Sequence, residues 1–325
     1  MNEEYDVIIV GSGPAGLTAG LYTSRANLKT LIIGGCKWGG QLMITSTVEN
    51  FPGFPEGIDG PELMKRMRAQ AERFGSKFIE DDLTGIDFST RPFKADVMGK
   101  LYLGKSIIIA TGAETKWLGL PSEQRLIGRG VSSCAPCDAP FFRGKKVVVV
   151  GGGDAAMEEA LVLCKFASEV AIVHRRDSFK ASKIMQERVL NNPNIKKIWN
   201  SEVVEVLGDN RVTGVKIKNN QTGEEQQLEA EGLFVSIGHV PVTQLFASSI
   251  HVDEKGYVIT RRHELHDKPE ETGLPISHKF HSMTNVDGVF SAGDVHDYHY
   301  RQAITAAGYG CEAALDVERW LTEAK

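Results

Sequence analysis

Residues 5–16, YDVIIVGSGPAG, predict the fold of this 325-residue chain. A short apolar strand, Tyr5–Val10, runs directly into a GxGxxG turn at Gly11–Gly16. A helix to about Asn27 and a second strand over 28–33 should follow. In this order of elements the glycines let the backbone approach a pyrophosphate at the helix N-terminus. We therefore expect a dinucleotide-binding βαβ unit at the start of the chain.

The same arrangement returns about 140 residues later in the chain. The strand KVVVV (146–150) precedes the glycine turn GGGDAA (151–156). A helix to about Phe166 and a strand over 169–174 complete the unit. Two such units predict two nucleotide sites, one in each of two domains. The expected fold class is α/β, with two Rossmann-like three-layer domains.

The residues after each second strand indicate which nucleotide each site prefers. The second unit ends in His174-Arg175-Arg176, where an NAD site would carry an acid. Arginine presents a planar set of donors to a phosphate, so this site should prefer NADPH, although an exposed basic turn is the alternative. The first unit ends in Ile33-Gly34, without the usual acid for the adenosine ribose. Other groups must recognise the ribose there.

The composition is that of an ordinary globular protein, with 42% hydrophobic and 24% charged residues and a net charge of −5. No excess of positive charge would attract nucleic acid or an anionic membrane. No apolar run approaches the roughly 20 residues that a membrane span needs. The chain enters a strand at once, without a signal peptide, so we expect a cytoplasmic protein. Structural disulfides are rare in that compartment.

The stretch VSSCAPCD (131–138) holds two of the five cysteines as Cys134 and Cys137. A zinc ribbon would need a second close pair, and the other three cysteines are scattered singly. A buried pair of small apolar residues is possible, but a redox dithiol is favoured in a cytosolic protein. Asp138 could hold a proton for a thiolate, or it could be a turn or cap aspartate. The residues alone leave those two roles equally plausible.

The remaining chain suggests further elements and one atypical segment. We expect a helix between Pro61 and Gly75, strands over 77–110 and 198–235, and a last helix over about 301–322. Residues 261–282 are charged and His-rich, and they include HELH (263–266) and HKFH (278–281). That spacing could suit a metal, but a solvated loop with incidental histidines is favoured. No metal site is therefore predicted.

Taken together, the motifs resemble one family, the low-molecular-weight thioredoxin reductases, from residue 5 to about 322. The CxxC pair lies just before the second glycine turn, as in that family, whereas the glutathione-reductase branch carries it near the first. The motifs that carry the resemblance are GSGPAG (11–16), GGQL (39–42), ENFPG (49–53), ATGA (110–113), SSCAPCD (132–138), GGGDAAMEEA (151–160), HRRD (174–177), GLFVSIGH (232–239), VFSAGD (289–294) and YRQAITAAGYGCEAALD (300–316).

The resemblance implies that one domain is inserted into the other. Residues 1–116 and 245–325 would form the FAD-binding domain, with an insertion expected at 261–282. Residues 117–244 would form the NADPH-binding domain that carries the CxxC. The connectors would allow the domains to rotate, and members of the family are typically homodimers.

The resemblance also implies which residues bind each cofactor. Those expected at FAD are Gly11, Gly13, Pro14, Ala15, Gly16, Gly40, Gln41, Asn50, Thr111, Gly112, Gly293, Asp294, Arg301, Gln302 and Ala303. Those expected at NADPH are Gly151, Gly153, Asp154, Ala156, His174, Arg175, Arg176, Lys180, Ile237 and Gly238. A last helix beginning at residue 301 would direct its positive end at the flavin ring.

The implied reaction passes a hydride from NADPH to FAD, then electrons to the Cys134–Cys137 disulfide, and ends with dithiol exchange that reduces oxidised thioredoxin. Asp138 would be the acid–base group. Which cysteine faces the flavin and which attacks thioredoxin stays open, with Cys137, beside Asp138, as the favoured candidate for the flavin side. Two positions depart from the family pattern. Lys180 replaces an arginine, which keeps the charge but loses the fork of donors. Ala139 replaces a glycine.

Three rival functions share some of these features. The same flavin–dithiol core could serve another disulfide partner, such as a glutaredoxin-like protein or a peroxiredoxin. Relatives that reduce peroxiredoxins carry an extra N-terminal region, and this chain starts at its first FAD strand, which favours thioredoxin. A redox sensor without turnover is less consistent with two cofactor turns, a dithiol and an acid. A zinc module is the weakest alternative.

Overall fold

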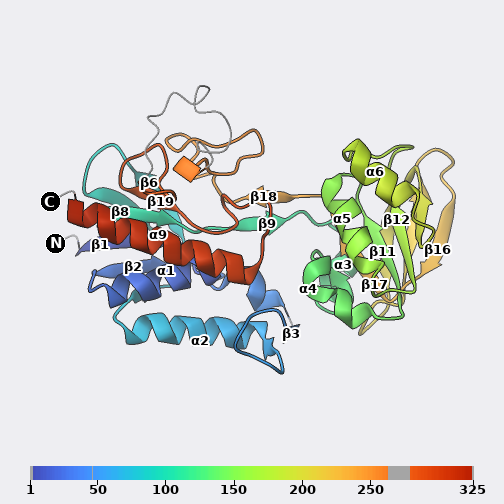
Figure 1. The fold of residues 1–325 in the computed structure, drawn as a ribbon, viewed down its shortest axis with the longest axis horizontal. Coiled ribbons are helices and arrows are strands. Elements are labelled where there is room, and N and C mark those ends of the chain that lie inside the picture. The colour runs from blue at the N-terminus through green and yellow to red at the C-terminus, as the bar shows by residue number, and fades with distance from the viewer. Residues whose placement is uncertain (1–2, 46, 263–278, 324–325) are drawn as a thin grey trace. The chain divides into compact units, whose positions relative to one another are not determined.

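The computed structural model describes residues 3–45, 47–262 and 279–323 of the chain. The chain divides into two compact units, coloured along its length in Figure 1. Unit 1 comprises Met1–Glu114 and Val240–Lys325, and unit 2 comprises Thr115–His239. The chain thus leaves unit 1, builds unit 2 and returns. The segments at the two crossings, β9 (Ala113–Thr115) and β18 (His239–Pro241), pair as a two-stranded sheet.

Unit 1 is built on a seven-stranded sheet with the order β5-β2-β1-β8-β7-β6, in which β19 also pairs with β8. Strands β5, β2, β1, β8 and β19 are parallel, and β7 and β6 extend the sheet in antiparallel fashion. The strands are β1 (Glu3–Val10), β2 (Thr30–Ile33), β5 (Lys77–Ile79), β6 (Leu83–Asp87), β7 (Phe93–Val97), β8 (Lys100–Ile109) and β19 (Val289–Ser291).

Strand β1 shows why this sheet has a core on each face. Successive side chains of a strand point to opposite faces. Val7 and Ile9 accordingly join the core beneath the helices, whereas Ile8 and Val10 join a second core on the other face. A strand that is buried on both faces reads as a continuous apolar run, and residues 7–10 are all buried.

The helices α1 (Pro14–Arg25), α2 (Gly60–Arg73) and α9 (Ala303–Glu323) lie along unit 1 in Figure 1. Helices α1 and α9 pack so closely that a side chain at Gly310 would lie 2.1 Å from the Ala15 carbonyl oxygen, and glycine at this position permits the approach. By contrast, a side chain at Gly308 would meet open space. The smaller elements of this unit are η1 (Gly40–Ile44), β3 (Thr47–Val48) and β4 (Ile58–Asp59).

Unit 2 contains a parallel five-stranded sheet, in the order β10-β17-β11-β12-β13, and a three-stranded antiparallel sheet, β14-β15-β16. Its strands are β10 (Val131–Ser132), β11 (Lys146–Val150), β12 (Glu169–Val173), β13 (Ile195–Ile198), β14 (Ser201–Leu207), β15 (Gly214–Asn219), β16 (Glu225–Glu229) and β17 (Gly232–Val235). Its helices are α3 (Pro121–Leu126), α4 (Ala135–Asp138), η2 (Ala139–Phe142), α5 (Asp154–Leu163) and α6 (Lys183–Leu190).

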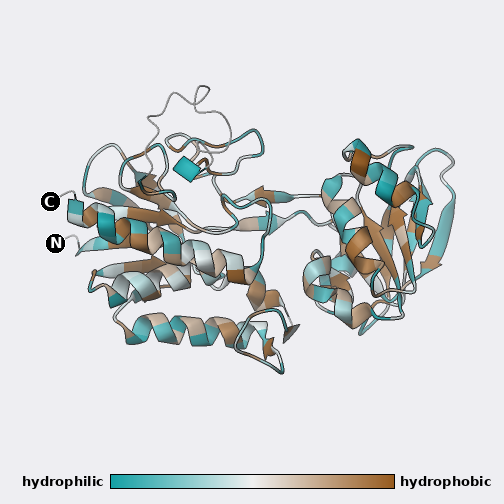
Figure 2. Cartoon of the chain, viewed as in Figure 1, coloured by the Kyte–Doolittle hydropathy of each residue, from teal (hydrophilic) through white to brown (hydrophobic). Residues whose placement is uncertain are grey.

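The parallel sheet of unit 2 separates two cores. Val147 and Val149 pack with α5, whereas Val148 and Val150 pack towards the antiparallel strands. Figure 2 shows β11 and β12 as hydrophobic and β16 as hydrophilic. The sheet is therefore covered on both faces, as parallel sheets generally are.

A carboxylate fixes the entry of the chain into unit 2. Glu123 is fully buried, and its side chain accepts backbone N–H groups from Leu118 at 2.8 Å, Gly119 at 2.9 Å and Leu120 at 3.4 Å. These bonds hold the turn that precedes α3. The chain that enters unit 2 is therefore anchored within three residues of β9.

The predicted fold class, with two Rossmann-like α/β units, is confirmed. The first helix ends at Arg25 because Asn27 has a φ of 62°, the left-handed conformation that terminates helices. The last helix begins at Ala303, so the expected start at residue 301 is wrong. Arg301 has a φ of 48°, which no helix accepts. Of the His-rich segment, residues 263–278 lie outside the described residues.

Candidate active site

The parallel sheet of unit 2 brings four predicted segments to one edge. Carboxyl ends of parallel strands meet at the same edge, which is where ligands bind in such sheets. The glycine turn 151–156 follows β11, and 174–180 follows β12. Residues 236–238 follow β17, and Cys134–Asp138 follows the edge strand β10. The dithiol and the second glycine turn thus belong to the same edge of the same sheet.

The second glycine turn has the features of a nucleotide-binding turn. A side chain at Gly151 would lie 2.4 Å from the Ser236 carbonyl oxygen and 2.7 Å from the Ala156 Cβ atom. One at Gly153 would meet nothing within 4 Å. The first position therefore needs glycine for packing, whereas the second leaves room for a ligand at the start of α5.

Backbone and side-chain bonds hold the arginine segment against this turn. The Gly152 carbonyl oxygen accepts the N–H groups of Lys180 at 2.7 Å and Ala181 at 3.1 Å. Asp154 Oδ1 accepts from Ser182 N at 2.9 Å and from Ser182 Oγ at 2.7 Å. Asp154, which was expected at the nucleotide, therefore positions the end of this segment.

Three cations of the segment are available to a ligand. Arg175, Arg176 and Lys180 are all exposed. In the part of the chain that the structure describes, no carboxylate forms an ion pair with any of them. This is the charge that a phosphate site requires.

His174 lies beneath the turn rather than beside the cations. Its ring is buried and packs near Phe179 and Trp199, with centroid distances of 5.7 and 6.3 Å. Burial lowers the pKa of His174, and the positive charges of Arg176 and Arg175 lower it further. The Nε2 atom has no hydrogen-bond partner among the described residues. The His174 ring thus packs against the glycine turn at Gly152.

Ile237 and Gly238 lie where unit 2 ends. Ile237 is exposed, and Gly238 has a φ of 111°. The Gly238 carbonyl oxygen accepts Lys116 N at 3.0 Å. These two residues therefore join the last strand of the sheet to the entering connector.

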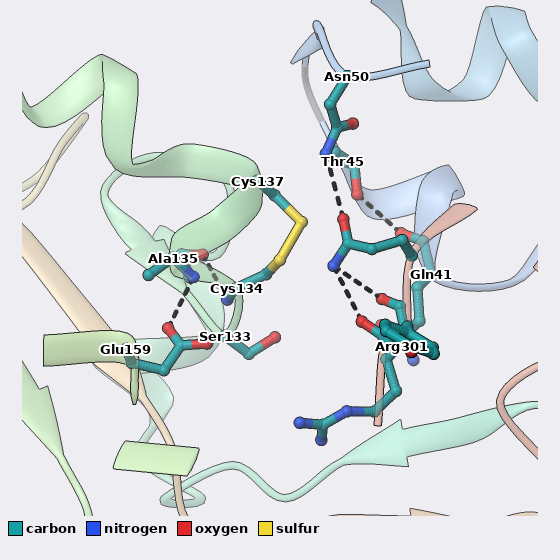
Figure 3. Close-up of a disulfide and its surroundings, with 12 residues drawn as sticks. Gln41, Thr45, Asn50, Ser133, Cys134, Ala135, Cys137, Glu159 and Arg301 are labelled. Carbon is teal, nitrogen blue, oxygen red and sulfur yellow. Dashed lines mark hydrogen bonds between the residues drawn. A yellow bond between two sulfur atoms is a disulfide. The ribbon is translucent and has the colours of Figure 1, made fainter. Parts of the chain in front are cut away.

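Cys134 and Cys137 form a disulfide, with an S–S distance of 2.05 Å and Cα atoms 5.3 Å apart (Figure 3). Cys134 is the N-cap residue of α4, which packs against α5. The remaining cysteines are free, with Cys36 exposed and Cys164 and Cys311 half-buried. Within residues 3–45, 47–262 and 279–323, no three His, Cys, Asp or Glu side chains cluster as metal ligands. The geometry favours a redox pair over a zinc ligand pair.

Asp138 is placed to hold a proton beside the disulfide. It ends α4 directly after Cys137. Burial raises the pKa of Asp138, and a hydrogen bond from the Ser132 hydroxyl lowers it by a smaller amount. Ser132 Oγ also accepts Cys134 N at 3.0 Å. One serine thus connects the acid to the cysteine turn.

A second carboxylate contacts the same turn from α5. Glu159 Oε2 accepts the Ala135 N–H at 2.6 Å, as the dashed line in Figure 3 shows. No motif of the sequence pointed to this contact, because the two residues are 24 positions apart.

Unit 1 has a corresponding edge, at the carboxyl ends of β1, β2, β8 and β19. A side chain at Gly11, whose φ is 114°, would lie 2.2 Å from the Ala110 carbonyl oxygen. One at Gly16 would lie 2.0 Å from the Gly11 carbonyl oxygen, whereas one at Gly13 would meet nothing within 4 Å. A side chain at Gly293 would lie 2.8 Å from the Ala15 Cβ atom. Segments from both ends of the chain therefore pack closely at this edge, whereas the space next to Gly13 is left empty by the protein.

Other predicted residues complete this edge. Pro14 and Ala15 open helix α1, as the proline at its first position permits. Thr111 Oγ1 donates to the Val242 carbonyl oxygen at 2.6 Å, and the Gly112 carbonyl oxygen accepts Val242 N at 3.0 Å. The segment 110–112 is therefore tied to the returning chain.

Ser12, a residue that the sequence interpretation did not single out, organises the next loop. Its Oγ donates to the Gly34 carbonyl oxygen at 2.8 Å and accepts Gly39 N at 2.9 Å. Gly40 follows, and a side chain there would lie 3.6 Å from the Gly13 Cα atom. Asp82 Oδ1 accepts Cys36 N at 2.9 Å, so an acid does reach the end of β2 from another part of the chain.

Asp294 is the clearest sign of a ligand in unit 1. Its Oδ1 atom is buried and has no hydrogen-bond partner among the described residues. Burial, helped by the charge of Asp297, raises the pKa of Asp294 to about 7. Buried polar atoms are normally hydrogen-bonded. A polar group of a ligand would satisfy this one.

The start of α9 is held by a turn around Asp297. Its carboxylate accepts the N–H groups of His299 and Tyr300 at 2.9 Å and of Arg301 at 3.2 Å. This turn explains the late start of the helix. Gln302 Oε1 accepts Asn50 Nδ2 at 3.2 Å, and Figure 3 draws this bond as the dashed line from the labelled Asn50. Gln41, in η1, is also drawn there, and its carbonyl oxygen accepts Thr45 Oγ1 at 3.0 Å.

No helix among the described residues is both long enough and apolar enough to cross a membrane.

Comparison with known proteins identifies the family to which the chain is similar. The model of the pyridine nucleotide-disulphide oxidoreductase family matches residues 5–310. A thioredoxin reductase from Rickettsia bellii is 51% identical over 98% of both chains. One from Streptomyces coelicolor is 50% identical, over 99% of this chain and 95% of its own. The structure of a thioredoxin reductase from Giardia duodenalis superposes with a TM-score of 0.89 at 42% identity, over 99% of this chain and 100% of the other.

Proposed function

Because this chain belongs to the pyridine nucleotide-disulphide oxidoreductase family, we propose that it is an NADPH-dependent thioredoxin reductase. The observation that carries the proposal is the Cys134–Cys137 disulfide, at the same sheet edge as a nucleotide-binding turn. Relatives of about half-identical sequence and nearly equal length bear that name. Cys134, Cys137 and Asp138 are the proposed catalytic residues.

Unit 2 is the proposed NADPH-binding domain. Its glycine turn leaves room at Gly153, where the unsatisfied N–H groups of α5 would bind the pyrophosphate. The exposed cations Arg175, Arg176 and Lys180 would bind the 2′-phosphate. Lys180 contributes charge without a fork of donors, so the two arginines should determine most of the preference for NADPH.

Unit 1 is the proposed FAD-binding domain, and its residues fit such a group. Gly13 leaves space at the N-terminus of α1, and Asp294 Oδ1 is a buried polar atom that has no hydrogen-bond partner among the described residues. Arg301, Gln302 and Ala303 would flank the flavin ring. When bound, FAD accepts a hydride from NADPH and supplies two electrons to a disulfide.

The cysteines perform the exchange with the partner. Reduction of the Cys134–Cys137 bond takes up two electrons and two protons and yields two thiols. One thiolate attacks the thioredoxin disulfide and forms a mixed disulfide, releasing a thiolate of thioredoxin that takes up a proton. The second cysteine then attacks the mixed disulfide, which restores Cys134–Cys137 and frees reduced thioredoxin. Asp138, whose pKa is raised by burial, can hold a proton during these steps.

The test is an anaerobic NADPH titration followed by a thioredoxin-coupled assay. We expect NADPH to bleach the flavin absorbance in the wild type and in Cys134→Ser, and thioredoxin reduction to be lost in the variant alone. Cys164→Ser, which changes a free half-buried cysteine, should keep both activities. Thioredoxin reduction by Cys134→Ser would contradict the dithiol assignment.

The same assay separates the rival partners and cofactors. A glutaredoxin-like protein or a peroxiredoxin, offered in place of thioredoxin, should be reduced far more slowly. NADPH should be used in preference to NADH, and Arg175→Ala should reduce this preference about tenfold or more. Arg188→Ala, an exposed arginine on α6, is the matched control. Equal use of both nucleotides by the wild type would contradict the phosphate site.

Two further predictions concern the protein in the cell. We expect a homodimer, which analytical ultracentrifugation of the purified protein would detect as twice the 35.6 kDa chain mass. We also expect a cytoplasmic location, which fractionation of the source cells would test.

A further inference from the structure

The N-terminal turn of α4 differs from a typical redox turn in how its N–H groups are used. A cysteine at a helix N-terminus usually has its thiolate stabilised by nearby N–H groups, which lowers the thiol pKa. Here the Cys134 N–H donates to Ser132 Oγ at 3.0 Å. The Ala135 N–H donates to Glu159 Oε2 at 2.6 Å. Both groups at the start of the turn are therefore already engaged by side-chain oxygens.

The rest of the turn offers no further N–H group. Pro136 has none. Cys137 N and Asp138 N both donate to the Cys134 carbonyl oxygen, at 3.2 and 3.1 Å. Every backbone N–H from Cys134 to Asp138 is thus engaged within the protein. In addition, the atom that accepts the Ala135 N–H, next to Cys134, is an oxygen of the Glu159 carboxylate.

We propose that Glu159 is a positioning residue that keeps the reduced Cys134 as a thiol and thereby makes the Cys134–Cys137 pair more strongly reducing. Its carboxylate occupies a donor that would stabilise a Cys134 thiolate and repels the charge of that thiolate. Stabilising a thiolate favours the reduced form of a disulfide and makes it more oxidising. Suppressing the thiolate has the opposite effect. The contact also connects the dithiol turn to α5, the helix that begins at the nucleotide turn.

Among the described residues of unit 2, the other charges on the elements packed most closely against α4 do not duplicate this role. Those elements are α5 and η2. On α5, Asp154 is engaged with Ser182, and Glu158 is exposed. The η2 segment carries no charged residue, and Arg143, which follows it, lies over the Phe166 ring. Asp138 is on α4 itself, where burial raises its pKa, and it is the same in the wild type and in both variants, so its effect cancels in the comparison.

The experiment compares Glu159→Gln with the wild type in the full-length protein. Glutamine keeps an oxygen for the Ala135 N–H but removes the charge, so the turn should keep its geometry. Glu158→Gln makes the same charge change one position away on the exposed side and is the control. The pH dependence of iodoacetamide alkylation of reduced Cys134, read by mass spectrometry, gives its thiolate fraction. We expect about tenfold more thiolate below the thiol pKa in Glu159→Gln and no change in Glu158→Gln.

A second measurement gives the equilibrium. Dithiothreitol reduces the Cys134–Cys137 bond and becomes a cyclic disulfide, so that one S–S bond breaks, another forms, and two hydrogen atoms pass to the cysteines. With wild type and variant in the same buffers, the contribution of dithiothreitol cancels. We expect Glu159→Gln to favour the reduced form several-fold at pH 9, and we expect this difference to shrink as the pH falls and thiolates take up protons. A purely structural role would not follow the thiol titration.

This inference rests on the proposed function only in taking Cys134 and Cys137 as the redox centre. The outcomes of the experiments separate the two proposals. Wild-type alkylation and equilibrium profiles in Glu159→Gln would overturn the role of Glu159, even if the protein reduces thioredoxin. A shifted profile together with no thioredoxin reduction by the wild type would support the role of Glu159 and refute the proposed function.

Discussion

Replacing Gly152 by alanine would push a methyl group into the ring of His174. A Cβ atom at this position would lie 2.2 Å from His174 Cε1, 2.4 Å from Nδ1 and 2.7 Å from Nε2. Atoms of this kind normally stay at least about 3.5 Å apart. The ring cannot easily retreat, because it is buried against Phe179 and Trp199, whose centroids are only 4.4 Å apart. Either the ring or the nucleotide turn must therefore move.

The cost follows from these contacts. Overpacking a close-packed core typically costs about 1–3 kcal/mol. A shift of the turn would also weaken the bonds from Lys180 and Ala181 to the Gly152 carbonyl oxygen, each worth about 1 kcal/mol. We expect Gly152→Ala to lower the unfolding free energy of unit 2 by about 2–4 kcal/mol. NADPH affinity should fall as well, because the cations on 175–180 are held by the same bonds.

A double-mutant cycle tests the cause. His174→Ala removes the obstructing ring. In that background Gly152→Ala should therefore lower the unfolding free energy by at least about 1 kcal/mol less than it does in the wild type, a difference that a double-mutant cycle can resolve. Stability would be followed by urea unfolding, read by hydrogen exchange of peptides from unit 2, and affinity by NADPH titration. Gly153→Ala is the control, because its Cβ atom meets nothing within 4 Å of protein. It should leave stability unchanged and weaken NADPH binding alone.

Two results would refute the reasoning. Additive costs of Gly152→Ala and His174→Ala would show that the ring and the methyl group do not compete for space. A wild-type unfolding profile for Gly152→Ala would show that the turn adjusts without loss.

Three further predictions concern other parts of the fold. Glu123→Ala should lower the unfolding free energy of unit 2 by about 3 kcal/mol, since three backbone N–H groups lose a buried acceptor, and an unchanged urea midpoint would contradict this. Asp138→Asn should be more stable than the wild type at pH 8, because burial raises the pKa of Asp138 and the folded wild type loses stability as pH rises through that pKa. This difference should vanish below the ordinary pKa of about 3.9, and a constant difference from pH 8 to pH 3.5 in thermal unfolding would exclude the mechanism. Gly310→Ala should destabilise the α1–α9 packing by several kcal/mol, whereas Gly308→Ala, in open space, should be neutral or stabilising by up to about 1 kcal/mol in the same assay.

Much of the fold could be predicted because its signals are local. The two strand–glycine–helix patterns specify their units within about 30 residues each, and the apolar runs 7–10 and 147–150 mark strands buried on both faces. The CxxC spacing favoured a redox dithiol, the family resemblance implied a Cys134–Cys137 disulfide, and the structure contains that disulfide. Parallel topology then brought the predicted segments to the sheet edges.

The residues that escaped prediction act across long separations in sequence. Ser12 joins a loop 22 positions away, and Glu159 binds a turn 24 positions away. No spacing rule relates such positions, because the fold alone brings them together. The start of the last helix was misplaced for a similar reason. The bonds from Asp297 to residues 299–301 delay the helix, and glycine-poor sequence gives little sign of a left-handed Arg301.

The division of unit 1 between the two ends of the chain has a consequence for biosynthesis. All of unit 2 leaves the ribosome before β19 and α9 are made, so it can fold while the N-terminal segment is still incomplete. At a synthesis rate of about 5–20 residues per second, roughly 10–40 s pass between the synthesis of the first 114 residues and that of β19 and α9, which complete unit 1. During that time the face of α1 that α9 later covers is exposed, with the close-packing surface around Ala15 open to solvent. The nascent N-terminal segment is therefore where we expect chaperones to bind this protein.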